Sequence, residues 1–364
     1  MGPLAYKTNS EAVIERLRPF YERRTPDHIY ATFGVPHTSR ILAAFRATHS
    51  DGECAYPDPA ERIAFWDALL AERPQLEDDS LPMAYLTEMD QGLYGGVLGG
   101  DVRFVCNTQT GWISSMVPRL LADWSAFDRL RFDPVNPWFQ RYLQQLQIFQ
   151  QGANGKFGIA SLVCCDGVNF IFELLGATDA YLSLIVDPEM AQRALELAYQ
   201  VAGAIQDAFF ARIPLFQGGT FSLNFGWLPG RVVMESVDPF HMTSVAYFES
   251  WGRAPLERML ARFDGGELHL HGNGRHLLEA VASVSGMKAI ILGEDIGYPP
   301  AFSILSALRA RAGDVPLGVL VGYPEFCAGL HNHTLSGGVL YHVSGAPSVL
   351  EANRTMEQVR DYRY

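Results

Sequence analysis

The feature that most constrains the fold of this chain is a regular alternation, from residue 81 onward, of short apolar segments with longer amphipathic ones. The short segments are rich in Val, Ile, Leu and Phe and predict strands at 83–87, 158–163, 220–223, 232–237, 267–271, 289–292, 317–321 and 339–343. The longer segments carry apolar residues at helical spacing and predict helices at 136–150, 188–212, 243–263, 277–284, 301–311 and 348–362. Strands separated by helices pair in parallel through right-handed crossovers.

This pattern predicts an α/β protein built as a single TIM-type (β/α)8 barrel, because about eight strand-and-helix units are enough to close one. An open doubly wound sheet is the alternative, but GNGRHL at 272–277 does not fit the GxGxxG fingerprint of that fold. Residues 1–80 predict helices instead, one after Asn9 or Ser10 and a second after Asp58 and Pro59. We therefore expect an N-terminal helical extension over residues 1–80 and the barrel over residues 81–364.

The composition narrows the class of protein and its partners. Of the 364 residues, 48% are hydrophobic and 19% are charged, which is typical of a globular enzyme and not of a disordered chain. The net charge of −12 repels a phosphate backbone, so we expect no nucleic-acid partner. We also expect no membrane association and a cytoplasmic location. No stretch approaches roughly 20 apolar residues, the N-terminus has no apolar signal core, and the five cysteines lack a disulfide-framework spacing.

The segment GGELHLHGNGRH, residues 265–276, places two histidines at the end of a predicted strand. His269 and His271 are two residues apart, so they share one side of the strand with α-carbons roughly 6.5–7 Å apart. That span lets two imidazoles meet at one ion. Catalytic zinc ordinarily takes three protein ligands and keeps one exchangeable position. The third ligand could be His342, Cys327, His331 or His333; alternatively, the two strand histidines bond neighbouring carbonyls and bind no metal.

Other polar residues at the expected strand ends are candidates for acid–base or binding roles. Asp90, Asp238 and Glu294 each follow a predicted strand and could orient or deprotonate a substrate group. Gly272 and Gly274 precede a helix whose free N–H groups, with Arg275 beside them, could hold an anion. A plain strand-to-helix turn explains these glycines equally well. Aromatic residues near strand ends could line an apolar pocket for a flat substrate: Phe170, Phe172, Phe221, Phe225 and Trp227.

Several segments taken together, in their order and spacing, resemble the uroporphyrinogen decarboxylase superfamily, which also contains zinc-dependent methyltransferases acting on methylcobamide proteins. The resemblance covers roughly residues 80–364. It rests on GGVLGGDVRF, KFGIASLVCCDGVNFIFELLGATDAYLSLIVDPEMAQRALELA, VDPFHMTSVAYFESWGRAPLERM, ELHLHGNGRHLLEAVASVSGMKAIILGED, VPLGVLVGYPE and VLYHVSGAPSVLEANRTMEQVRDY. It implies a single β/α barrel with the active cleft at its carboxyl face.

The decarboxylase branch of this superfamily is matched only in part. Its arginine-bearing N-terminal motif, often MRQAGR, has no counterpart here, and the nearest upstream segment, IYATFGVPHTSR, carries only Arg40. The resemblance assigns the branch's aspartate to Asp90 and its late histidine to His342. Phe172 replaces its tyrosine. We therefore expect this branch to be the alternative, as a decarboxylase of a tetrapyrrole or another aromatic acid.

The methyltransferase branch holds zinc with an HxCG motif and a late cysteine. Here HLHG stands in that place, so His269 matches the histidine, His271 replaces the cysteine, and His342 falls near the late cysteine. The resemblance thus implies zinc on His269, His271 and His342, without the thiolate softness that suits a thiol acceptor. The function expected first is metal-dependent methyl transfer between a small molecule and a corrinoid protein, with a homodimer as a further expectation. A barrel that binds a tetrapyrrole or corrinoid without catalysis is the remaining alternative.

Overall fold

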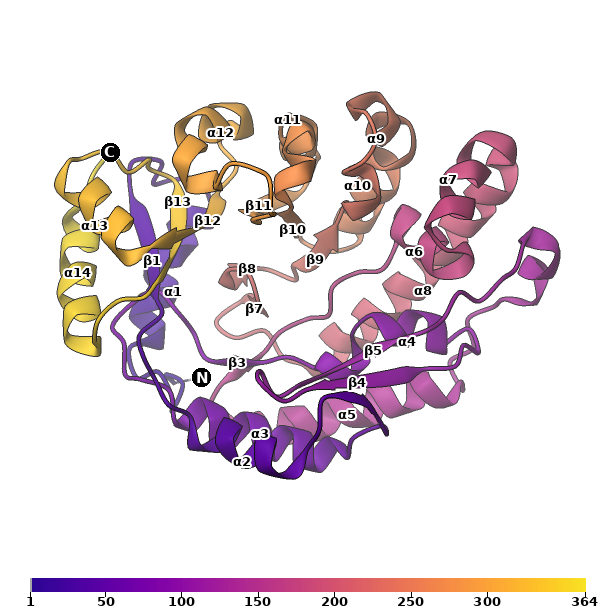
Figure 1. Ribbon diagram of the computed structural model, residues 1–364, viewed down its shortest axis with the longest axis horizontal. Coiled ribbons are helices and arrows are strands. Elements are labelled where there is room, and N and C mark those ends of the chain that lie inside the picture. Colours follow the sequence, from indigo (N-terminus) through magenta and orange to yellow (C-terminus); the bar gives the residue numbers. More distant parts are fainter. Residues whose placement is uncertain (1) are drawn as a thin grey trace.

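The computed structural model describes residues 2–364. Its central feature is a six-stranded parallel sheet with the strand order β1-β13-β12-β11-β10-β9. These strands are β1 (Ile29–Phe33), β9 (Val233–Ser236), β10 (Gly266–Leu270), β11 (Met287–Leu292), β12 (Leu317–Gly322) and β13 (Val339–Ser344). In Figure 1 the strands gather in the middle of the molecule and the helices surround them.

Two further parallel strands lie beyond β9. β3 (Met83–Ala84) pairs with β6 (Gly158–Ile159), and a single bridge between Val163 and Met234 joins the segment after β6 to β9. The α/β class, with parallel strands and alternating helices, is therefore confirmed. The strand pairings within residues 2–364 show no closed barrel, because no ladder joins β1 to β3.

Side chains, in place of a neighbouring strand, satisfy the free edge of β1. Asp79 Oδ2 accepts a hydrogen bond from Ala31 N at 2.9 Å, and Asp78 Oδ2 accepts one from Phe33 N at 2.8 Å. Lys7 Nζ lies 2.9 Å from Asp78 Oδ1, so this buried carboxylate has a buried cation as its partner. The two aspartates thus occupy this edge of β1, and they protect an edge that would otherwise be open to pairing.

Several helices begin where a capping side chain is followed by proline. Asp58, Asn136 and Asp187 each accept a hydrogen bond from a backbone N–H and precede a proline at the first helical position, as the sequence predicts for Asp58. The helices are α1 (Ser10–Tyr21), α2 (Arg40–Thr48), α3 (Pro59–Ala71), α4 (Asp90–Gly96), α5 (Pro137–Ala153), α6 (Gly167–Leu175), α7 (Ala177–Val186), α8 (Pro188–Arg212), α9 (Val245–Trp251), α10 (Arg253–Arg262), α11 (Leu278–Ala282), α12 (Leu305–Ala312), α13 (Tyr323–His331) and α14 (Val349–Asp361).

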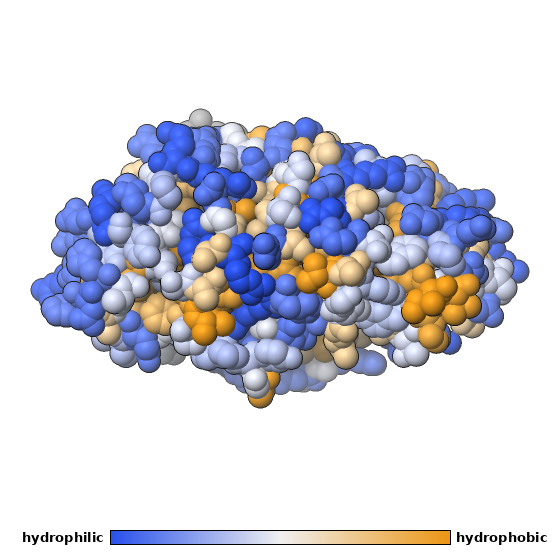
Figure 2. All heavy atoms as spheres, turned by 90° about the horizontal axis from the view of Figure 1, so that it is seen from above, coloured by the Kyte–Doolittle hydropathy of each residue, from blue (hydrophilic) through white to orange (hydrophobic). Residues whose placement is uncertain are grey.

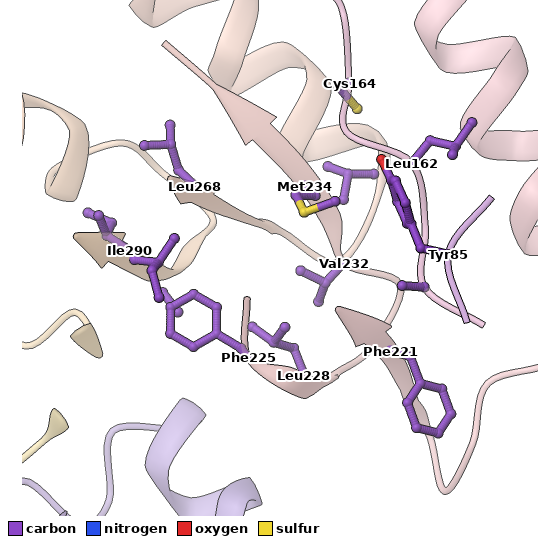
Figure 3. Close-up of a cluster of buried hydrophobic side chains, with 14 of the residues drawn as sticks. Tyr85, Leu162, Cys164, Phe221, Phe225, Leu228, Val232, Met234, Leu268 and Ile290 are labelled. Carbon is purple, nitrogen blue, oxygen red and sulfur yellow. The ribbon is translucent and has the colours of Figure 1, made fainter. Parts of the chain in front are cut away.

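Apolar side chains from the sheet and from a hairpin fill the interior. The hairpin consists of β7 (Gly219–Ser222) and β8 (Gly226–Pro229), which pair antiparallel. Figure 3 shows Phe225 and Leu228 of this hairpin gathered with Val232, Leu268 and Ile290, and all five are buried. The interior is therefore a packed core, in which the buried carboxyl groups of Glu235 and Glu267 are polar exceptions within β9 and β10.

Two predictions about strands are wrong. The segment 220–223 overlaps strand β7, but this strand pairs antiparallel with β8 in the hairpin, and only one isolated parallel bridge, from Phe221 to Ala160, joins it to the parallel strands. Residues 29–33 fall in the expected helical extension, yet they form β1, which pairs with β13 from Ile29↔Val339 to Phe33↔Val343. A small antiparallel sheet was also not expected: β2 (Gly52–Cys54), β4 (Arg103–Asn107) and β5 (Trp112–Met116). The first 80 residues thus supply strands as well as the expected helices.

The surface is mostly hydrophilic and is interrupted by separate hydrophobic patches in the view of Figure 2. Exposed large hydrophobic side chains include Leu182, Ile185 and Val186 of α7. None of the helices described in residues 2–364 is by itself long and apolar enough to cross a membrane. The pair α6 and α7 reaches the required length and composition together, but it is bent by 114° at Gly176.

Candidate metal centre

The candidate centre lies at the carboxyl ends of β9 and β10. Side chains alternate along β10, so His269 in the strand and His271 just after it lie on the same side. The register pairs His269 with Ser236 at the end of β9. Asp238 follows two residues later, in the 3-10 turn η3 (Asp238–Phe240), and this brings its carboxylate beside the two imidazoles.

The ligand atoms of these three residues are spaced as one ion requires. Asp238 Oδ1 lies 3.2 Å from His269 Nε2 and 3.9 Å from His271 Nε2, and the three atoms all lie within 4.8 Å of one another. Donors at about 2.0–2.1 Å from a tetrahedral zinc ion stand about 3.3 Å apart. Two imidazoles and one carboxylate form a donor set that zinc and other divalent transition metals accept. Asp238, His269 and His271 could therefore hold a metal ion.

Asp238 and His269 each favour the charged form of the other, as the partners in an ion pair do. Burial opposes charge on both groups, but the hydrogen bond and the attraction between them outweigh it. The pKa of Asp238 consequently falls below its ordinary value, and the pKa of His269 rises above its ordinary value. Asp238 is thus a carboxylate at neutral pH, as a metal ligand must be.

A second carboxylate orients His271. Asp295 Oδ1 lies 3.1 Å from His271 Nδ1, and Asp295 Oδ2 accepts a hydrogen bond from Asn273 N at 3.1 Å. With Nδ1 engaged in this way, Nε2 of His271 is the nitrogen that faces Asp238. A carboxylate on the outer nitrogen is the usual support of a metal-binding imidazole.

A third imidazole lies against the group. His241 follows η3 and is only 8% exposed; its Nε2 is 3.6 Å from Asp238 Oδ1. The centroid of its ring lies 5.4 Å from the centroid of the His271 ring, and the two ring planes are inclined by 62°. Burial is the main reason that the pKa of His241 falls to about 4. Its Nε2 is buried and has no hydrogen-bond partner within the described part of the chain.

His342, the third ligand expected from the sequence, is not one of the residues of this group. It lies in β13, three strands from β10 and roughly 14 Å away along the sheet at about 4.8 Å per strand. Its Nδ1 is 3.0 Å from Thr32 Oγ1, and burial lowers its pKa to about 4. Asp238 lies beside the two strand histidines because β9, and not β13, is the neighbour of β10.

The predicted anion site at Gly272, Gly274 and Arg275 is occupied by groups of the chain itself. The neighbouring Asn273 N donates to Asp295. The guanidinium of Arg275 donates to the carbonyls of Pro299 and Gly293, and to Glu294 Oε2 at 3.2 Å. A bound anion would have to displace these partners.

Glu294 and Asp90 are held in local hydrogen bonds. The other oxygen of Glu294 accepts from Ala301 N at 2.8 Å, so Glu294 joins Arg275 to the segment after β11. Asp90 begins α4 and accepts from Tyr85 Oη at 2.9 Å; burial raises its pKa to about 6. It lies beyond the end of β3, and Asp238 lies beyond the end of β9.

Phe172 lies in α6 and packs edge-to-face against Tyr181 of α7, with ring centroids 5.0 Å apart. Tyr181 in turn donates a hydrogen bond to Pro239 O, next to Asp238. The contact therefore ties the α6–α7 corner to the turn that carries the candidate ligand.

Two residues of the centre were not assigned a role from the sequence. Asp295 is one of a pair of acids that follow β11, and nothing in the pattern distinguishes it from Glu294. His241 stands three residues after Asp238 in VDPFH, and this spacing in a 3-10 turn was the available signal.

Comparison with known proteins supports the fold. No protein-family model matches the sequence, and no curated protein sequence matches it. The structure is similar to that of a methyltransferase from Methanosarcina mazei, with a TM-score of 0.58 and 13% sequence identity. The similarity covers 98% of this chain and 99% of the other. The two chains therefore share their overall fold along their whole length.

Proposed function

We propose that this protein is a zinc-dependent methyltransferase that moves a methyl group between a corrinoid protein and a small-molecule substrate. The observation that carries the proposal is the group of Asp238, His269 and His271 at the carboxyl ends of two neighbouring parallel strands. The fold similarity to a methyltransferase supports it. We further interpret the eight parallel strands as a (β/α)8 barrel, whose carboxyl end is where such folds carry their chemistry.

The ion would lower the pKa of a bound nucleophile at neutral pH. The chain's own residues prepare the place for it: Asp238 offers a carboxylate, and Asp295 keeps the ring of His271 in one orientation. The methyl group would leave cobalt with the electron pair of that bond remaining on the corrinoid. The lone pair of the acceptor would form the new bond, and the proton of the acceptor would pass to a base or to water.

The decarboxylase alternative lacks the cations that it needs. A cleft that holds a multiply charged tetrapyrrole must pair its carboxylates with several basic groups. Arg40 pairs with Glu72 at 3.1 Å, and Arg103 pairs with Asp101 at 3.2 Å. Arg275 is occupied by two carbonyls and Glu294. None of these arginines approaches the candidate ligands through a described contact.

The test is an anaerobic assay with three proteins in two kinds of vessel. One vessel contains uroporphyrinogen, and the others contain methylcobalamin with small thiol, hydroxyl or amine acceptors. The proteins are the wild type, His269→Ala, and the control His276→Ala, whose imidazole bonds Thr243 O outside the group.

We expect the wild type and the control to demethylate the cobalamin, and His269→Ala to lose this activity. Release of carbon dioxide from uroporphyrinogen with no demethylation would contradict the proposal. Binding of either compound without turnover would contradict it as well, in favour of a binding protein.

A further inference from the structure

The unexplained feature next to the candidate centre is the imidazole of His241. A buried polar atom nearly always has a hydrogen-bond partner, yet Nε2 of His241 has none among residues 2–364. The side chain is only 4% exposed, so water does not readily supply one. The atom lies 3.6 Å from Asp238 Oδ1, between the distances at which His269 and His271 approach that same oxygen.

The chain makes room for this ring at one glycine. A Cβ atom on Gly274 would stand 2.2 Å from Cδ2 of His241 and 2.5 Å from its Nε2, far inside contact distance. Gly274 has no positive φ that would require glycine, so the close approach of the ring accounts for the residue. The glycine of HGNG at this position therefore serves to admit an imidazole against the turn that follows β10.

We propose that His241 is a fourth protein ligand of the metal ion held by Asp238, His269 and His271. This inference rests on the proposed metal centre. Its distance to Asp238 supports it, since donors on one tetrahedral zinc ion stand about 3.3 Å apart and His241 Nε2 lies 3.6 Å from Asp238 Oδ1, between the distances of His269 and His271 from that oxygen. His241 is outside the group whose ligand atoms all lie within 4.8 Å of one another, so its ring would move toward the two histidines when the ion binds. Coordination would also satisfy the nitrogen that the chain leaves without a partner.

A fourth ligand has a consequence for substrate entry. Zinc with four protein ligands has no open position, whereas a catalytic zinc needs one. His269 lies within β10 and is fixed by the ladder, and His271 is held by Asp295. His241 lies in the short turn after η3 and no hydrogen bond holds its Nε2. His241 is therefore the ligand that gives way when a substrate binds the ion.

The test uses the full-length protein loaded with cobalt(II), whose visible absorption is strong in four-coordinate sites and weak in sites with more ligands. The variants are His241→Ala, His241→Leu, which refills the apolar space of the ring, and Gly274→Ala, which pushes the ring away. The matched control is Gly293→Ala, whose added Cβ would meet only ordinary contacts, the nearest being His271 Cα at 3.5 Å. His269→Ala tests the centre itself, and zinc affinity is measured for every protein by competition with a chelator.

We expect the wild type and Gly293→Ala to give the same intense four-coordinate spectrum. His241→Ala, His241→Leu and Gly274→Ala should still bind cobalt, with an altered spectrum. Their zinc affinity should fall by more than the roughly 10–100-fold typical of losing an outer-shell partner. Unchanged spectra and affinities in both His241 variants would overturn the role of His241 and leave the three-ligand centre intact. Absence of cobalt binding by the wild type would instead overturn the centre.

Discussion

Asp90 offers a prediction in which the structure sets both the sign and the size of the effect. Its pKa lies at about 6 against an ordinary value of 3.8, because burial disfavours the charged carboxylate. The folded protein therefore holds this proton more tightly than the unfolded chain. The difference of about 2 pKa units corresponds to about 3 kcal/mol. This free energy is an upper bound because the side chain of Asp90 keeps some contact with solvent.

The sign follows from linkage. The contribution of Asp90 to the free energy of unfolding is complete well below pH 3.8, where the carboxyl group is protonated in both the folded and the unfolded chain. This contribution is lost as the pH rises through about 6. About half of the loss has occurred by about pH 5, and nearly all of it by about pH 7.5. Asp90→Asn carries no charge and still accepts the hydrogen bond from Tyr85. The variant should therefore gain stability over the wild type as the pH rises, by about 1.5 kcal/mol between these two conditions.

The assay is urea unfolding of the wild type, Asp90→Asn and a control at about pH 5 and about pH 7.5. The control is Asp101→Asn, which removes the same charge from a side chain that is 77% exposed. The free energy of unfolding of the control should differ from that of the wild type by the same small amount at both pH values. An Asp90→Asn variant whose advantage does not grow with pH would refute the assigned cause of the pKa shift.

Two further predictions concern the sheet edge and the metal centre. Asp79→Ala leaves Ala31 N and the cation Arg16 without their buried partner. The free energy of unfolding, measured by urea titration, should therefore fall by about 3–5 kcal/mol. A change within about 1 kcal/mol, the size of a surface effect, would show that the edge of β1 does not depend on Asp79. Asp295→Asn should weaken zinc binding about 10–100-fold in chelator competition, since the carboxylate on His271 Nδ1 is lost. Unchanged affinity would mean that Asp295 does not orient the ligand.

Much of the sheet could be predicted because its strands are nearly uniform apolar runs between helices. β9 falls within its expected segment, and β10, β11, β12 and β13 overlap theirs with ends that differ by one or two residues. The strand β1, IYATF, is a short run in a region otherwise rich in helical signals, so its long-range pairing with β13 had no local mark. The segment 220–223 has the same local pattern as a parallel strand, and only the close return at 226–229 makes it a hairpin.

Only the part of the candidate site that lies on a single strand could be predicted from residue spacing. Two histidines at positions i and i+2 share a side of any strand, which placed His269 and His271 together. The third ligand depends on which strand lies next to β10, and the order of strands in space is not written in local sequence. For this reason the sequence points to His342, although Asp238 follows the strand that is adjacent to β10. The role of His241 is indicated only by the three-dimensional structure, in which its ring approaches Gly274 closely.

The most direct test of the central claim is the metal content of the full-length protein purified without a histidine tag, measured by elemental analysis that covers zinc, iron and other first-row metals. We predict close to one zinc per chain in the wild type and in His342→Ala. Asp238→Ala, His269→Ala and His271→Ala should lose most of the metal while keeping a cooperative unfolding transition. Near-stoichiometric metal that survives in these three variants, or that disappears in His342→Ala, would contradict the site described here.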